Sequence, residues 1–123
     1  ILEGVHKGAD QLAEALKGAG FEVEVGGPGA VPINLEEMAV YDTIILSDIN
    51  APDLSQTQLQ SLERSVTHLG HGLVMLGGDR SFGLGGYYKT PVERALPVKM
   101  TRQAQAQMPS QGITLAIDRS GSM

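Results

Sequence analysis

The chain has 123 residues, no cysteine and a formal net charge of −5. Its length allows one ordinary hydrophobic core, and an apolar content of 41% is typical of a globular protein. The acidic balance and the scattered lysines and arginines argue against a nucleic-acid binder, the missing thiol excludes a cysteine nucleophile, and no apolar run approaches the roughly 20 residues of a membrane-spanning helix.

Strands and helices are predicted to alternate from the start of the chain. Residues 1–2 indicate the end of a first strand, and apolar residues at helical spacing predict a helix across residues 12–19. Gly20 is a typical left-handed cap for that helix. The alternation of apolar and acidic residues in 21–25 (FEVEV) predicts a strand near the edge of a sheet.

The middle of the chain contains the clearest strand and the longest helix. Asn34 is predicted to cap a short helix over residues 35–39, and the run 43–47 (TIILS) predicts a central strand. Ser55 is predicted to cap a helix that ends near Gly70. The side chains expected to form the buried stripe of this helix are Leu59, Leu62, Val66 and Leu69.

A glycine-rich loop follows the last predicted strand. The unbroken apolar run 72–76 predicts a strand that helices cover on both faces. The glycines that crowd into the next ten residues are Gly77, Gly78, Gly83, Gly85 and Gly86. Pro91 begins a short helix through Ala95. The order of elements predicts a three-layer, flavodoxin-like α/β fold with a mostly parallel sheet and helices on both faces.

The candidate site is the carboxyl edge of this sheet, because open α/β sheets bind ligands beyond the ends of their strands. The candidate ligand- or partner-binding residues there are Asp48, Gly78, Asp79, Arg80, Ser81 and Tyr87. The glycines favour a tight turn over a phosphate cradle, since GLGG does not match the phosphate-binding motifs. Asp48 and Asp79 could pair as carboxylates, although capping a helix or binding Arg80 is favoured. Tyr87 either packs the loop down or forms a partner surface.

Most of the chain resembles a known family. The segments YDTIILSD, HGLVMLGGDRSFGLGGY and TPVERALPV resemble the class I glutamine amidotransferase-like domain of bacterial proteins that also carry a von Willebrand factor type A domain. The resemblance implies an amidotransferase-like α/β domain over residues 1–100. Active members carry a cysteine on a G-x-C-x-G turn, served by a later histidine. Here the turn reads GGDRS, and no histidine follows residue 71, so the glutaminase reaction is not expected. Ser81 is the remaining candidate nucleophile, and it has no evident base.

The end of the chain carries a second resemblance. Residues 112–123 (GITLAIDRSGSM) look like the first strand and the DxSGS metal motif of a type A domain, after a linker over residues 101–111. The resemblance implies that Asp118, Ser120 and Ser122 are the first Mg²⁺ ligands, with two more in later loops. No cofactor is therefore expected in this chain, whereas Mg²⁺ is expected in an intact type A domain. The apolar residues 112–118 are expected to pack on the first domain or on a second copy.

The sequence favours a non-catalytic binding or scaffold module over an enzyme. The expected partner is another protein, of a kind that the residues do not specify. The parent, by resemblance, is a larger membrane-anchored bacterial protein of which this chain is a piece. Two alternatives use the Gly77–Tyr88 loop: a hydrolase-like enzyme, or a sensor in which the glycines and Arg80 hold a small anion.

Overall fold

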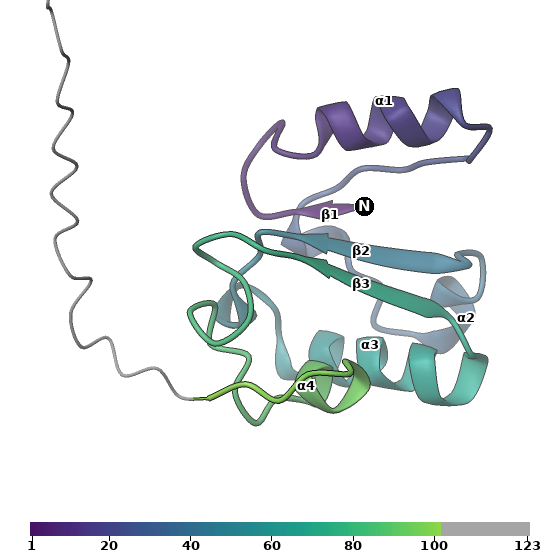
Figure 1. Ribbon diagram of the computed structural model, residues 1–123. Coiled ribbons are helices and arrows are strands. Elements are labelled where there is room, and N and C mark those ends of the chain that lie inside the picture. Colours follow the sequence, from purple (N-terminus) through teal and green to yellow (C-terminus); the bar gives the residue numbers. More distant parts are fainter. Residues whose placement is uncertain (102–123) are drawn as a thin grey trace, which may run out of the picture.

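A computed structural model describes residues 1–101. Its three strands, β1 (Leu2–Glu3), β2 (Thr43–Ser47) and β3 (Gly72–Leu76), form one parallel sheet in the order β1-β2-β3 (Figure 1). All five residues of β2 pair in register with those of β3, from Thr43 opposite Gly72 to Ser47 opposite Leu76. The predicted parallel sheet is confirmed, because every connection between its strands passes through a helix.

Helices lie on both faces of the sheet, which confirms the three-layer, flavodoxin-like α/β architecture (Figure 1). One helix lies over β1 on one face, and three pack on the other face. The helices are α1 (Asp10–Gly18) on the first face and α2 (Leu35–Met38), α3 (Gln56–Leu69) and α4 (Pro91–Ala95) on the second, with short 3₁₀ turns at Pro28–Ala30 and Ala51–Asp53. No helix in residues 1–101 is both long enough and apolar enough to cross a membrane.

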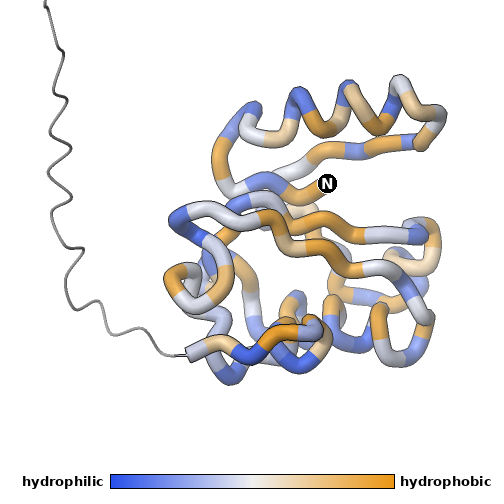
Figure 2. The backbone as a smooth tube through the Cα atoms, viewed as in Figure 1, coloured by the Kyte–Doolittle hydropathy of each residue, from blue (hydrophilic) through white to orange (hydrophobic). Residues whose placement is uncertain are grey.

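The hydrophobic core lies between the sheet and α3. Met38 and Leu62 are fully buried there, and Leu46 of β2 is 1% exposed. Figure 2 shows hydrophobic residues concentrated along β2 and β3, the two strands that α3 covers. Burial of these aliphatic side chains is the main force that holds the layers together.

The predicted ends of α3 are confirmed. The Ser55 hydroxyl accepts a hydrogen bond from the backbone N–H of Gln58, and the Gln58 side chain accepts one from the Ser55 N–H, which completes a capping box. Gly70 ends the helix in the left-handed conformation, with φ of 72°. The buried stripe differs at its end, because Leu69 is 39% exposed. Ser61 is buried instead, and its hydroxyl donates to the carbonyl of Ile33.

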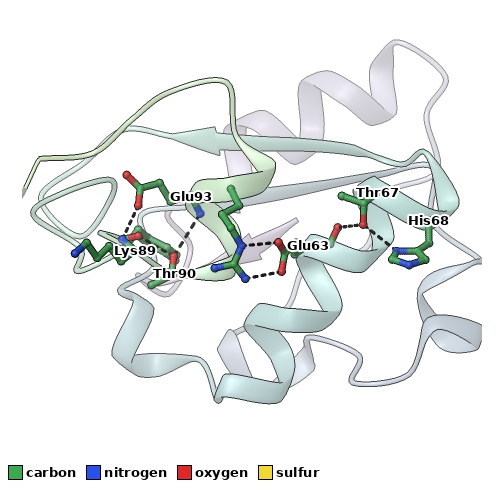
Figure 3. Close-up of polar contacts among 8 residues, drawn as sticks. Glu63, Thr67, His68, Lys89, Thr90 and Glu93 are labelled. Atoms are coloured by element: carbon green, nitrogen blue, oxygen red, sulfur yellow. Dashed lines mark hydrogen bonds and ion pairs between the residues drawn. The ribbon is translucent and has the colours of Figure 1, made fainter.

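The short helix α4 is fixed to α3 by a two-pronged ion pair. The Arg94 guanidinium donates from Nε and from a terminal nitrogen to the two carboxylate oxygens of Glu63, at 2.7 and 2.9 Å (Figure 3). This contact lowers the pKa of Glu63 and raises that of Arg94. At the start of α4, the Thr90 hydroxyl accepts a hydrogen bond from the N–H of Glu93. The cap at the start of α4 and the ion pair near its end therefore fix the position of this helix, which follows the glycine-rich loop.

The predicted strand over residues 21–25 is wrong. This segment runs beside β1, but only Gly26 forms a parallel bridge, to Leu2. In the register set by this bridge, the residues before Val25 have no partner on β1, which spans only Leu2–Glu3. The end of this segment is still tied to the start of the chain, because the Ile1 amine donates to the carbonyl of Glu24, but residues 21–25 form no strand.

The prediction that helices cover both faces of β3 is also wrong. Leu73 and Met75 pack against the core on one face, whereas Val74 and Leu76 are 40% and 37% exposed on the other. Within residues 1–101, the helix on that second face is α1, and it lies over β1 (Figure 1). An unbroken apolar run does not reveal whether its strand lies in the centre or at the edge of a sheet.

Candidate functional site

Three loops meet at the carboxyl edge of the sheet, each following one strand. The loop after β3 is held to the other two through Arg80. The backbone N–H of Arg80 donates to the carboxylate of Asp48, in the loop after β2, at 2.8 Å. The Arg80 guanidinium donates to the carbonyl of Gly4, in the loop after β1, at 3.3 Å. The structure thus brings Asp48 and Arg80 together, as the favoured interpretation of the aspartate predicted, although through the backbone amide of Arg80 rather than an ion pair. Asp79 is exposed beside them.

The glycines of this edge allow backbones and side chains to approach closely. A Cβ at Gly78 would lie 2.2 Å from a carboxylate oxygen of Asp48, and a Cβ at Gly85 would lie 2.1 Å from the carbonyl oxygen of Arg80. A Cβ at Gly4 would lie 1.9 Å from the carbonyl oxygen of Asp48. These separations are far below van der Waals contact. At Gly4 and Gly85 the obstacle is backbone, so both positions require glycine for steric reasons, whereas at Gly78 the side chain of Asp48 would have to move.

Tyr87 fastens the glycine-rich loop to the loop after β2. Its side chain is fully buried, and its hydroxyl donates to the carbonyl of Ile49 at 2.9 Å. Burial, with a smaller contribution from Asp53, raises the pKa of this phenol, so the hydroxyl stays protonated and remains a donor. The backbone N–H of Ala51 also donates to the carbonyl of Gly85. The prediction of Tyr87 as a partner-binding residue is therefore corrected, because no partner can reach it.

Ser81 is the hydroxyl residue of the GGDRS turn and lies two residues after Asp79, which aligns with the cysteine of the G-x-C-x-G pattern. Its side chain is buried, with 2% exposure, and its hydroxyl donates to the carbonyl of Leu76 at 2.7 Å. The hydroxyl therefore caps the end of β3 from inside the turn. A nucleophile needs a free lone pair directed at a substrate and a base within hydrogen-bond reach. In residues 1–101, no hydrogen bond joins the Ser81 hydroxyl to a base.

The histidines lie away from Ser81. His6 is 89% exposed on its side chain and faces Glu3, with 3.7 Å between its Nδ1 and a carboxylate oxygen. His68 contacts the hydroxyl of Thr67 within α3 (Figure 3). His71 directly precedes β3 and so lies at the opposite, amino end of that strand. The arrangement contains no serine–histidine pair in the described part of the chain.

Glu3 is a structural carboxylate that the sequence analysis missed. Its two oxygens accept hydrogen bonds from the backbone N–H groups of Lys7 and Ala9, at 3.0 and 3.1 Å. The bond from Lys7, followed by that from Ala9, lowers the pKa of Glu3 below its ordinary value. Its side chain is only 11% exposed. An acidic residue between a strand and a glycine was the available signal, since such a carboxylate can close the following turn.

Replacing Glu3 by glutamine is expected to make stability less dependent on pH in the acid range. When folding lowers the pKa of a carboxyl group, the ionised group stabilises the fold at pH values above the pKa in the unfolded chain, near 4.5. This stabilisation is lost as the pH falls through the lower pKa of the folded chain. Urea unfolding at pH 7 and pH 3 measures both chains. The wild type should lose more stability than Glu3→Gln between these pH values, and an equal loss would contradict the assigned role.

Backbone strain concentrates in the same three loops. The residues other than glycine with positive φ are Lys7 after β1, Asp48 after β2, and Phe82 and Lys89 after β3. Their φ values lie between 49° and 63°, a region that side chains with a Cβ disfavour. Each such residue costs about 1–3 kcal/mol, and strain of this kind collects at functional sites. The carboxyl edge therefore combines a strained backbone with hydrogen bonds between its loops that hold it in place.

The outward-facing residues of the glycine-rich loop form what we call the loop surface: Asp79, Arg80, Leu84 and Tyr88. Leu84 is 56% exposed and Tyr88 36%. The ammonium group of Lys89 lies 5.2 Å from the centre of the Tyr88 ring. Across residues 1–101, His, Cys, Asp and Glu side chains form no group of three or more that could hold a metal ion. The predicted ligands Asp118, Ser120 and Ser122 lie outside the described residues, as does the segment 112–118.

Comparison with known proteins gives one match. Residues 3–120 match the family described as "Putative glutamine amidotransferase" (GATase1_like). The match continues beyond residue 100, into the residues predicted to form the linker and the first type A strand. No curated protein and no solved structure matches the chain.

Proposed function

The chain belongs to the GATase1_like family of glutamine amidotransferase-like domains, and from this premise we propose that it is a non-catalytic binding or scaffold module of a larger protein. The burial of Ser81 carries the proposal. In a chain without cysteine, the only hydroxyl at the expected nucleophile turn is 2% exposed and donates to the carbonyl of Leu76. In the alignment of GGDRS with G-x-C-x-G, Asp79 takes the cysteine position, and the nearby hydroxyl of Ser81 has a structural role.

The hydrogen bonds between the loops of the carboxyl edge support a binding role. Arg80, Tyr87 and Gly85 connect the glycine-rich loop to the loops after β1 and β2 by hydrogen bonds. A surface held in this way is preorganised, so little conformational entropy is lost when a partner binds to it.

The proposed contact with a protein partner is the loop surface. It combines an apolar pair, Leu84 and Tyr88, with an acidic and a basic neighbour, Asp79 and Arg80. Aromatic and arginine side chains are enriched at the centres of protein interfaces, where they combine large contact area with directed hydrogen bonds. Asp48, Gly78 and Tyr87 support this surface from beneath and do not contact the partner themselves.

The proposed larger protein places a type A domain after this module. The donor set of Asp118, Ser120 and Ser122, a carboxylate and two hydroxyls, suits the hard cation Mg²⁺. In that protein, these three residues would hold the ion together with two ligands from later loops. The resemblance to membrane-anchored bacterial proteins supports a setting in which the module displays or restrains the type A domain.

Hydrolysis assays test the non-catalytic part of the proposal. The rates at which the wild-type chain hydrolyses glutamine and a p-nitrophenyl ester are expected to equal the rates of Ser81→Ala. No acceleration above buffer is expected, because the buried hydroxyl lacks a base. Loss of the oxygen that caps Leu76 will lower stability by about 1 kcal/mol, so folding of both chains is checked by circular dichroism. A rate that depends on Ser81 would overturn the proposal in favour of the hydrolase.

Binding by the loop surface is tested separately. Capture of a protein from an extract of the source organism is expected to decrease at least ~10-fold on Leu84→Asp, since removing one interface anchor costs 1.4 kcal/mol or more. Val40→Asp is the matched control, because Val40 is 76% exposed outside the loop surface. Equal losses in both variants, or in neither, would exclude this surface as the contact.

A further inference from the structure

The strand β3 has an open edge in the described part of the chain. One side of β3 pairs with β2 along all of Gly72–Leu76, and within residues 1–101 no strand pairs with its other side. An edge of five residues presents a row of backbone N–H and C=O groups that can accept another strand. Such an edge, when apolar, also promotes aggregation unless something covers it.

The side chains at this edge are incompletely covered on both faces. Leu73 and Met75 are partly buried against the core. Val74 and Leu76 are exposed on the face that α1 leaves free (Figure 1). A strand placed alongside β3 would shield both rows and complete the hydrogen bonds of the edge.

We propose that residues 112–118 of this same chain pair with β3 as a fourth strand of the sheet. In this segment Ile113, Leu115 and Ile117 alternate with Thr114 and Ala116, which gives a strand one apolar face and one face of small side chains. The apolar face continues the row of Leu73 and Met75, towards α4. The small side chains continue the row of Val74 and Leu76, which no helix of residues 1–101 covers. In the proposed larger protein the same segment would instead form the first strand of the type A domain, so the pairing is proposed for this 123-residue chain.

The connection is long enough to reach. The carbonyl oxygen of Thr101 lies 2.9 Å from the position that a Cβ of Gly83 would occupy, so the described chain ends beside the glycine-rich loop, at the carboxyl end of β3. The ten residues 102–111 span up to about 35 Å when extended, whereas β3 is only about 17 Å long. Both ends of β3 are therefore within reach.

The connection through residues 102–111 also explains why residues 112–118, and not a second copy of the chain, are proposed to pair with β3. A connection of ten residues holds the segment near the edge at an effective concentration of the order of millimolar. At micromolar protein, pairing within the chain is therefore favoured over the same contact between two chains. Pairing also removes Ile113, Leu115 and Ile117 from water.

Introduced cysteine pairs test the pairing directly, because the chain contains no cysteine of its own. Val74→Cys is combined with Thr114→Cys or with Ala116→Cys, and disulfide formation is followed on non-reducing gels at micromolar protein. At least one pair is expected to form an intramolecular disulfide ~10-fold faster than the same partner cysteine combined with Val40→Cys, an exposed position in the segment before β2. Equal rates would refute the proposal, and so would disulfide-linked dimers as the main product.

Amide hydrogen exchange provides a second test on the unmodified chain. Residues 113–117 are expected to exchange at least ~10-fold more slowly than an unstructured peptide of the same sequence. Leu115→Asp should abolish this protection, while Thr114→Asp, which changes the other face by the same charge, should largely preserve it. Exchange at the unstructured rate throughout the wild-type segment would overturn the proposal, as would equal losses in the two variants.

Discussion

Tyr87→Ala is expected to lower the free energy of unfolding by about 4 kcal/mol, since replacing a large buried aromatic residue by alanine typically costs 3–5 kcal/mol. The side chain is fully buried in the core cluster, and its hydroxyl satisfies the carbonyl of Ile49. The substitution leaves a cavity and an unpaired carbonyl where the loops after β2 and β3 meet. Urea unfolding followed by circular dichroism measures the change.

Tyr87→Phe separates the two contributions. This variant keeps the ring and removes only the donor to Ile49, so a loss of about 1–3 kcal/mol is expected. Tyr88→Phe is the matched control, because the neighbouring ring is 36% exposed and its loss of a hydroxyl should change stability by no more than about 0.5 kcal/mol. Equal effects of the two phenylalanine substitutions would show that the Tyr87 hydroxyl does not stabilise the loop.

Gly85→Ala is expected to lower the free energy of unfolding by about 3 kcal/mol, at the upper end of the usual cost of overpacking. The added Cβ would lie 2.1 Å from the carbonyl oxygen of Arg80. Because the obstacle is backbone rather than the end of a flexible side chain, relief requires the turn itself to move. Such a movement would weaken the hydrogen bond from Ala51 to Gly85 and the contact between Arg80 and Asp48. Chemical denaturation gives the size of the loss.

Gly18→Ala is the matched control for this prediction. Gly18 lies in α1, and a Cβ there would meet no atom within 4 Å. The same substitution should therefore stabilise the protein by about 0.5–1 kcal/mol, because alanine favours helix and restricts the unfolded chain. If Gly85→Ala proved as harmless as Gly18→Ala, the close approach of the two backbones would not exist in solution.

Local sequence patterns predicted the regular elements well. The ranges of β2 and β3 and the range of α4 agree with the structure, and Ser55 and Gly70 cap α3 as expected. Each of these signals acts within a few residues: an apolar run, a hydroxyl that accepts from the third residue of its helix, or a glycine that adopts positive φ. Such contacts are encoded next to the residues that make them.

The failed predictions concern contacts between distant segments. Residues 21–25 have the alternation of a strand but lack a partner of sufficient length on β1. The apolar run of β3 was expected in the middle of the three layers, yet it lies at the edge of the described sheet. Tyr87 was a candidate for a partner surface, and its position beneath the loop follows only from its bond to Ile49, 38 residues earlier.

The sequence by itself determined which chemistry this chain lacks and where its elements lie. The absence of cysteine and the glycine-rich GGDRS turn are properties of single residues and short motifs, so no structure was needed to see them. Only the tertiary structure decided what the turn does. It placed the Ser81 hydroxyl inside, against Leu76, and put the glycines against Asp48 and Arg80. The contact between Gly78 and Asp48 joins loops that follow different strands, whose proximity depends on how the whole sheet is packed.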